Sequence, residues 1–130
     1  MANDTKPEPK VVPPRPGLGH LVDATGYSIA GMARLLRETA ARQEMILGGV
    51  LASLLGLFGA SAGQFLTLAG LFALMLAVEA LNTAVEVLVD RVSPEWSQAA
   101  KDAKDLGSLA VGLMVCCNIG FVAAVGLGLV

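Results

Sequence analysis

The chain has few charged residues and lacks the motifs of the common soluble enzyme classes. Charged side chains make up 15% of its 130 residues, whereas an average soluble domain contains about 25%. No Walker motif, GxGxxG loop, Ser/His/Asp set or Cys/His set is present. The net charge of −2 gives no sign of a nucleic-acid partner. With 55% apolar residues and a mean hydropathy of +0.67, the composition favours a membrane protein.

Cysteine and proline are scarce in the body of the chain. The only cysteines, Cys116 and Cys117, are adjacent within an apolar run, and neighbours on a helix point about 100° apart. We therefore expect packing thiols, with neither a disulfide nor a cysteine metal site. Five of the six prolines lie in residues 1–19, which are predicted to form a disordered cytoplasmic tail ahead of a single domain at 20–130.

The domain is predicted to be all-α and to lie in the membrane. Residues 27–44 show an apolar helical period with charges on the other faces, which indicates an amphipathic surface helix with Ser28 as its N-cap. Because about 20 apolar residues cross a hydrocarbon core, three transmembrane helices are expected. Their ranges are 45–63, 65–89 and 106–130.

The distribution of basic residues predicts the orientation of these helices. All nine Lys and Arg residues lie before residue 45 or within 91–104. By the positive-inside rule, the N-terminus and the 91–104 connection are cytoplasmic. The C-terminus is then periplasmic, and the chain is expected in a bacterial inner membrane.

A polar stripe enters the membrane at the cytoplasmic end of the second span. Its members are Glu79, Asn82, Glu86 and Asp90. They lie within about 80° of one another around a helix, and Glu79 is roughly 9 Å short of the cytoplasmic boundary. Ionisable groups at such depth are costly and usually functional, so we interpret the stripe as a site. Asn118, which is alone in the third span, is expected only to link helices.

A carboxylate before the first span lies at a similar depth to the stripe. Glu38 precedes that span by about 10 Å of helix, which brings it near the depth of Glu86. Two carboxylates on packed helices are suitable ligands for a hard divalent cation. The residues alone therefore predict a metal-capable acidic site with Glu79 as a candidate general base.

Three functions fit these features. They are an enzyme that brings a soluble anion to a lipid hydroxyl, an oligomer that translocates ions or protons through Glu79, and a structural membrane subunit. A translocation path needs polar groups on the far side, but residues 65–78 contain only Thr67 as a candidate. Because the polar groups gather at the cytoplasmic end, they favour interfacial chemistry, for which Lys104 is a candidate phosphate ligand.

Two motifs resemble those of the small integral-membrane diacylglycerol kinases of bacteria. Residues 79–91 read EALNTAVEVLVDR and fit the signature ExLNxAxExxxDR, and KDLGS follows at 104–108. The elements GYS at 26–28 and ExxxRQE at 38–44 match in order and spacing to within one residue. The resemblance covers about residues 20–130.

The resemblance implies a homotrimer with active sites shared between subunits and transfer of the γ-phosphate of MgATP to diacylglycerol. It makes Glu79 the general base, Glu38 and Glu86 the Mg²⁺ carboxylates, and Asn82 and Asp90 supporting polar groups. The implied nucleotide-binding positions are Tyr27, Glu38, Glu86, Glu95, Trp96, Ser97, Lys104 and Asp105. The implied substrate-binding positions are Glu79, Ser108, Arg42, Gln43 and Glu44.

The sequence also departs from the family pattern. His20 stands where an arginine is often found, and the surface helix is one residue shorter than usual. Undecaprenol is the alternative lipid acceptor, because related small kinases share the signature.

Overall fold

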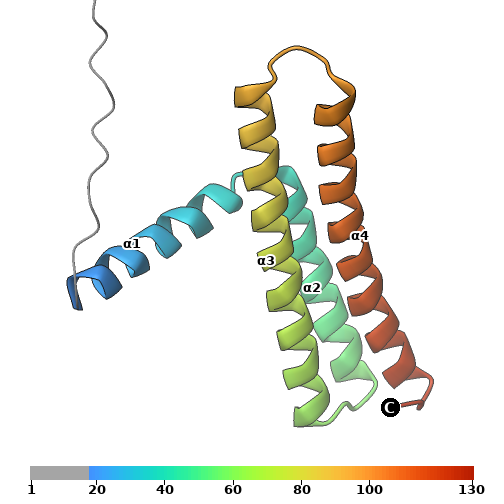
Figure 1. Ribbon diagram of the computed structural model, residues 1–130. Coiled ribbons are helices and arrows are strands. Elements are labelled where there is room, and N and C mark those ends of the chain that lie inside the picture. The colour runs from blue at the N-terminus through green and yellow to red at the C-terminus, as the bar shows by residue number, and fades with distance from the viewer. Residues whose placement is uncertain (1–17) are drawn as a thin grey trace, which may run out of the picture.

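The computed structural model describes residues 18–130, and these residues are helical without any strand. The four helices are α1 (Leu18–Leu35), α2 (Thr39–Leu57), α3 (Ala62–Val92) and α4 (Gln98–Gly126). In Figure 1, α2, α3 and α4 run alongside one another, and α1 projects away from them. The all-α fold class is confirmed for the described residues, whereas the expected tail lies almost entirely outside them.

The boundaries of the first helix differ from the prediction. The helix expected at 27–44 is α1, which begins at Leu18 and ends at Leu35, and residues 39–44 belong to α2 instead. Between the two helices, the N–H groups of Arg37 and Glu38 donate to carbonyls three residues earlier, at 3.1 and 2.9 Å. These tighter bonds end α1 and let the chain change direction. Ser28 is therefore not an N-cap, and its hydroxyl donates to the Ala24 carbonyl inside α1 at 3.0 Å.

Two of the three expected spans are long and apolar enough to cross a membrane. These are α3, with 31 residues, and α4, with 29 residues. The helix α3 extends past the expected range 65–89 at both ends, whereas α4 begins before residue 106 and ends at Gly126, short of the expected 130. The remaining expected span, at 45–63, corresponds to α2, which has 19 residues and carries Arg42 and Glu44 near its start.

The three bundle helices pack around a small apolar core. Leu51 and Leu55 of α2, Leu68 of α3 and Val122 of α4 form this core. Close packing of α2 against α3 favours a glycine at position 48, since a Cβ there would clash with the Phe72 ring, with its Cζ atom at 2.7 Å and another ring atom closer still. Large apolar side chains elsewhere remain exposed. They include Val50, Leu66, Leu81, Leu88 and Leu113, all more than half exposed, as is typical of surfaces covered by lipid or a partner chain.

The isolated amide of the third span links two helices, as expected. Asn118 is fully buried in α4, and its Nδ2 donates to the Leu71 carbonyl of α3 at 3.3 Å and to the Met114 carbonyl at 2.9 Å. Cys116 and Cys117 form no disulfide among the described residues. Both thiols are exposed, so they do not pack inside the protomer.

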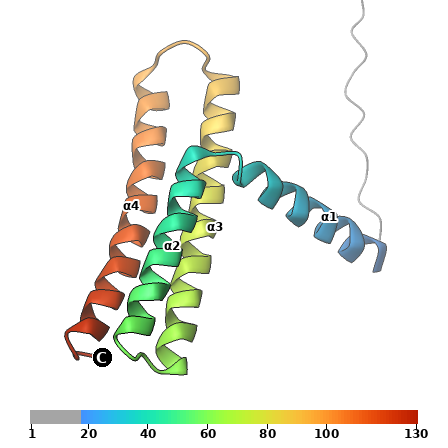
Figure 2. The ribbon, with the colours of Figure 1, turned by 180° about the vertical axis from the view of Figure 1, so that it is seen from behind.

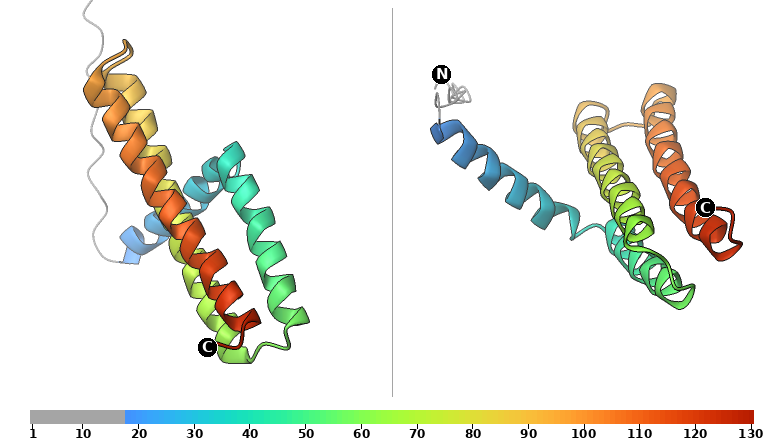
Figure 3. Two further views of the ribbon diagram at one scale, coloured as in Figure 1. Left: turned by 90° about the vertical axis from the view of Figure 1, so that its right-hand side faces the viewer. Right: turned by 90° about the horizontal axis from the view of Figure 1, so that it is seen from below.

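The two ends of the bundle differ in charge. The joint between α1 and α2 lies toward the same end as the α3–α4 connection, and α3 and α4 extend beyond the start of α2 (Figure 2). The described basic residues lie in these segments. At the opposite end, the α2–α3 connection has no basic residue, and Ser61 and Gln64 form a capping box at the start of α3. Gln64 Nε2 also donates to the carbonyl of Val130 at 3.0 Å, which ties the last residue to this end (Figure 3).

Candidate active site

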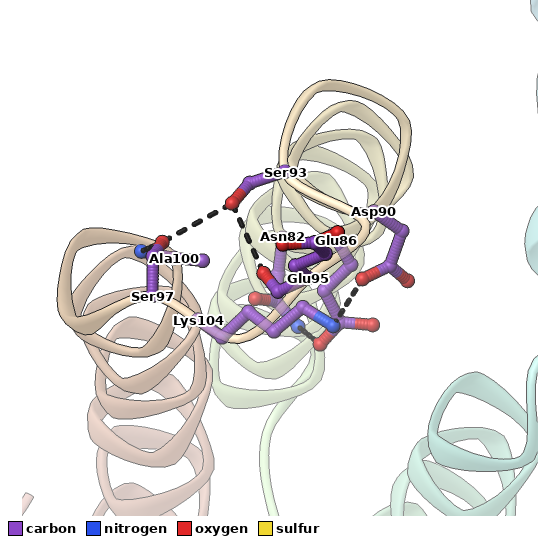
Figure 4. Close-up of polar contacts among 8 residues, drawn as sticks. All are labelled: Asn82, Glu86, Asp90, Ser93, Glu95, Ser97, Ala100 and Lys104. Carbon is purple, nitrogen blue, oxygen red and sulfur yellow. Dashed lines mark hydrogen bonds and ion pairs between the residues drawn. The ribbon is translucent and has the colours of Figure 1, made fainter.

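The polar stripe occupies the half of α3 nearest the α3–α4 connection. Glu79 is buried, with 3% of its surface exposed, although it lies on a helix that is long and apolar enough to cross a membrane. Asn82 lies one turn further on, and its Nδ2 donates to Glu79 Oε2 at 3.5 Å and to Glu86 Oε1 at 3.3 Å. One amide therefore joins the two carboxylates, and Figure 4 shows its bond to Glu86.

The stripe continues to α4 through an ion pair. Lys104 Nζ lies 2.5 Å from Asp90 Oδ1, and Figure 4 shows the lysine extending from α4 across to Asp90 on α3. Because Asp90 is at the outer end of the stripe, this contact places the ammonium near the carboxylates without burying it. An exposed ammonium in this position is available to an anionic ligand.

A hollow of about 340 Å³ lies between the ends of α3 and α4. Its lining includes five positions predicted to bind nucleotide, namely Glu95, Trp96, Ser97, Lys104 and Asp105. Trp96 is 79% exposed, so its side chain is accessible to a ligand in the hollow. Asp105 forms an ion pair with Lys101 on the same helix.

Serine hydroxyls shape the connection that borders this hollow. Ser97 is the N-cap of α4 and accepts from the Ala100 N–H at 3.2 Å. The Ser93 hydroxyl donates to the Glu95 carbonyl at 3.2 Å and lies 3.1 Å from the Ser97 hydroxyl (Figure 4). These local bonds hold the loop in a defined turn.

Glu38 lies at the joint between α1 and α2. It occupies the N-cap position of α2 with extended backbone, but its side chain makes no capping hydrogen bond. The carboxylate forms an ion pair with Arg34 instead. Sequence reasoning missed this partner, although the spacing of four residues between opposite charges is a recognisable signal.

The carboxylates suit a metal ion that arrives with phosphate. Mg²⁺ usually takes one or two protein carboxylates, and phosphate oxygens and water complete its shell. Within residues 18–130, no three potential ligands cluster into a site built from protein alone. Glu38 and Glu86 each supply a carboxylate, which is the protein ligand that Mg²⁺ commonly takes beside phosphate and water.

The substrate positions predicted in α2 have different environments. Glu44 is buried, with 6% of its surface exposed, and its Oε2 accepts no hydrogen bond from the described protein. Arg42 and Gln43 are exposed, and the Arg42 guanidinium donates to Thr39 Oγ1 at 3.3 Å.

Other predicted positions lie apart from these contacts in the protomer. Tyr27 is 76% exposed on α1, and Ser108 is exposed on α4. Neither belongs to the lining of the hollow.

A large apolar groove lies between α1 and α3. It has a volume of about 850 Å³ and is lined mainly by apolar and small side chains, including Met32, Leu35, Leu76 and Val87. Thr83, Ser28 and Arg34 contribute its polar groups. Its shape and lining suit an extended apolar ligand.

Comparison with known proteins identifies related sequences. The sequence profile of a family described as prokaryotic diacylglycerol kinase matches residues 26–126. The chain is 43% identical over 102 residues to a diacylglycerol kinase of a Sinorhizobium species, and the aligned region covers 78% of this chain and 74% of the relative. It is 41% identical over 95 residues to a diacylglycerol kinase of Pseudomonas aeruginosa, and this aligned region covers 72% of the chain and 77% of the relative.

Proposed function

The chain belongs to the prokaryotic diacylglycerol kinase family and is a lipid kinase of the membrane, and from this premise we propose the reaction and its residues. The kinase transfers the γ-phosphate of ATP to the hydroxyl of diacylglycerol and forms phosphatidic acid. The observation that supports this most strongly is the buried Glu79, which Asn82 joins to Glu86 below a hollow bordered by Lys104.

Each residue of the site has a role in this proposal. The Glu79 carboxylate takes the proton of the lipid hydroxyl while the hydroxyl oxygen bonds to the γ-phosphorus. The bond between that phosphorus and the β–γ bridging oxygen breaks, which releases ADP. Lys104 contacts the phosphates, and Asp105 contacts the ribose. Glu38 and Glu86 hold Mg²⁺, which neutralises phosphate charge when bound.

Asn82 and Asp90 act by position. Asn82 orients the two carboxylates through its amide, and Asp90 holds the Lys104 ammonium at the edge of the hollow until phosphate replaces it. Glu95, Trp96, Ser97 and Tyr27 contribute nucleotide contacts. Arg42, Gln43, Glu44 and Ser108 contribute contacts on the acceptor side.

The proposal includes a homotrimer with shared active sites. The exposed apolar surfaces of α2, α3 and α4 are consistent with partner subunits as well as lipid. Glu38 lies at the joint between α1 and α2 and Glu86 lies on α3, and neighbouring subunits would bring further contacts to them. In the same proposal, α2 is the third transmembrane helix.

The membrane placement follows from charge. The end of the bundle that carries the α1–α2 joint and the α3–α4 connection faces the cytoplasm of a bacterial inner membrane, and the C-terminus faces the periplasm. In this orientation the hollow opens toward cytoplasmic ATP. The apolar groove between α1 and α3 suits an acyl chain of the acceptor lipid.

A transfer assay tests the proposal. Purified protein in mixed micelles receives γ-labelled ATP, Mg²⁺ and either diacylglycerol or undecaprenol, and the extracted lipids are separated by chromatography. We expect labelled phosphatidic acid and little labelled undecaprenyl phosphate. Label mainly on undecaprenol would identify undecaprenol, and not diacylglycerol, as the acceptor. No label on either lipid would overturn the proposed reaction.

A further inference from the structure

Asn82 meets α4 at a point where the helix has no side chain. The residue opposite is Gly107, and a Cβ on it would lie 3.2 Å from Asn82 Cγ and closer still to Oδ1. These separations are shorter than an unstrained contact between such atoms, because carbon atoms pack at about 3.5–4.0 Å. The amide oxygen therefore occupies space that any other L-residue at position 107 would fill.

The two ends of the Asn82 amide have different neighbours. Its Nδ2 donates to Glu79 and Glu86, and these acceptors require the nitrogen because carboxylates do not donate. Its Oδ1 must then point the other way. That oxygen is buried and accepts no hydrogen bond from the described protein, and it lies where a Cβ on Gly107 of α4 would stand.

We propose that Gly107 is a positioning residue for phosphoryl transfer. By leaving room for the Asn82 oxygen, it keeps the amide nitrogen between Glu79 and Glu86, and thus fixes the spacing of the base and the metal carboxylate. The assignment rests on the proposed function for the roles of those two carboxylates. Gly107 itself touches neither substrate.

The geometry distinguishes this role from ordinary packing. The atoms that an added Cβ meets are the far end of one flexible side chain and not the α3 backbone. The Gly107→Ala variant therefore relieves the clash by turning Asn82, while α3 and α4 keep their contacts. The Asn82 amide then leaves one or both carboxylates, and transfer slows although the fold persists.

The test is a double-mutant cycle of Gly107→Ala and Asn82→Ala. We measure kcat, KM for ATP, the Mg²⁺ concentration for half-maximal rate, and the thermal midpoint of unfolding in detergent. Gly107→Ala alone is expected to lower kcat by at least about tenfold, to change KM for ATP by less than about twofold, and to shift the thermal midpoint little. In the Asn82→Ala background, Gly107→Ala is expected to have no further effect on kcat.

Gly112→Ala is the matched control. Gly112 lies on the same helix, and a Cβ there meets no atom within 4 Å, so its variant should retain the kcat of the parent. The double variant covers the case in which Gly107→Ala alone fails to fold, because removal of the Asn82 side chain leaves room for the new Cβ.

The outcomes separate the inference from the proposed reaction. A tenfold loss that disappears in the Asn82→Ala background supports the role of Gly107. Unchanged kcat in Gly107→Ala, or the same loss with and without the Asn82 side chain, overturns it. A double variant that is less active or less stable than Asn82→Ala also overturns it. Absence of phosphatidic acid from the parent protein contradicts the proposed function itself, whatever the variants show.

Discussion

Replacing Lys104 with methionine removes an ammonium and keeps a long, unbranched side chain. In the structure the Lys104 ammonium lies 2.5 Å from Asp90, and the two side chains are 40% and 66% exposed. Exposed ion pairs contribute about 0–1 kcal/mol to stability. A hydrogen bond to a charged group contributes about 1.5–3 kcal/mol. The variant should therefore lose much more ATP binding than stability.

The expected changes in ATP binding and in stability follow from these two energies. A loss of about 1.5–3 kcal/mol corresponds to an increase of roughly 12- to 160-fold in the dissociation constant of the nucleotide. Initial rates measured against ATP concentration at saturating diacylglycerol give KM, and thermal unfolding in the same detergent reports stability. We expect KM to rise at least about tenfold while the thermal midpoint of unfolding shifts little, because the ion pair is exposed.

Lys101→Met provides a stringent control. Lys101 also borders the hollow and is 53% exposed, but its ammonium pairs with Asp105 along α4 and not with Asp90 of α3. Its variant should change stability to a similar extent and KM for ATP by less than about threefold. A KM in Lys104→Met within twofold of the parent, or equal increases in both variants, would refute the phosphate role of Lys104.

Three further predictions concern the proposed metal carboxylates Glu86 and Glu38 and the buried amide of Asn118. Glu86→Gln should raise the Mg²⁺ concentration for half-maximal rate by at least about tenfold, and an unchanged Mg²⁺ titration would remove Glu86 from the metal. Arg34→Ala frees the Glu38 carboxylate from its ion pair, so the same titration should shift to lower Mg²⁺ by about 1.4- to 5-fold; a shift to higher Mg²⁺ would contradict this. Asn118→Ala removes the bond to α3 and should lower unfolding stability by about 0.5–2 kcal/mol with kcat unchanged, whereas the neighbouring exposed Cys117→Ala should alter neither.

Sequence periodicity predicted the elements that depend on local chemistry. The polar stripe follows from the spacing of Glu79, Asn82 and Glu86 on one helix, and the structure joins these three side chains through the Asn82 amide. The apolar stretches likewise predicted α3 and α4, because burial in lipid requires long helices with few charges. In both cases the signal lies within one helix.

The break between α1 and α2 could not be read in the same way. The residues around it, from Arg34 to Ala41, include neither glycine nor proline, and most of them favour helix. The chain turns at 36–38 because Leu35 packs into the protein while α2 must align with the bundle. This is a tertiary constraint that local propensity does not contain.

Contacts between helices were also beyond the sequence. The Lys104–Asp90 pair spans 14 positions and depends on the register of the α3–α4 hairpin. The contact of Gly107 with Asn82 depends on the same register, and the glycine carries no signal of its own. Only the packed hairpin shows which residues of α4 complete the stripe.

The central claim is that the buried Glu79 takes the proton of the lipid hydroxyl, and Glu79→Gln tests it most directly. Glutamine keeps the shape of the side chain and its position beside Asn82 but does not act as a base. We expect the variant to fold and to bind MgATP as the parent does, while the rate of phosphatidic acid formation falls about 10²- to 10⁴-fold. Turnover close to that of the parent in a folded, MgATP-binding Glu79→Gln variant would contradict the account.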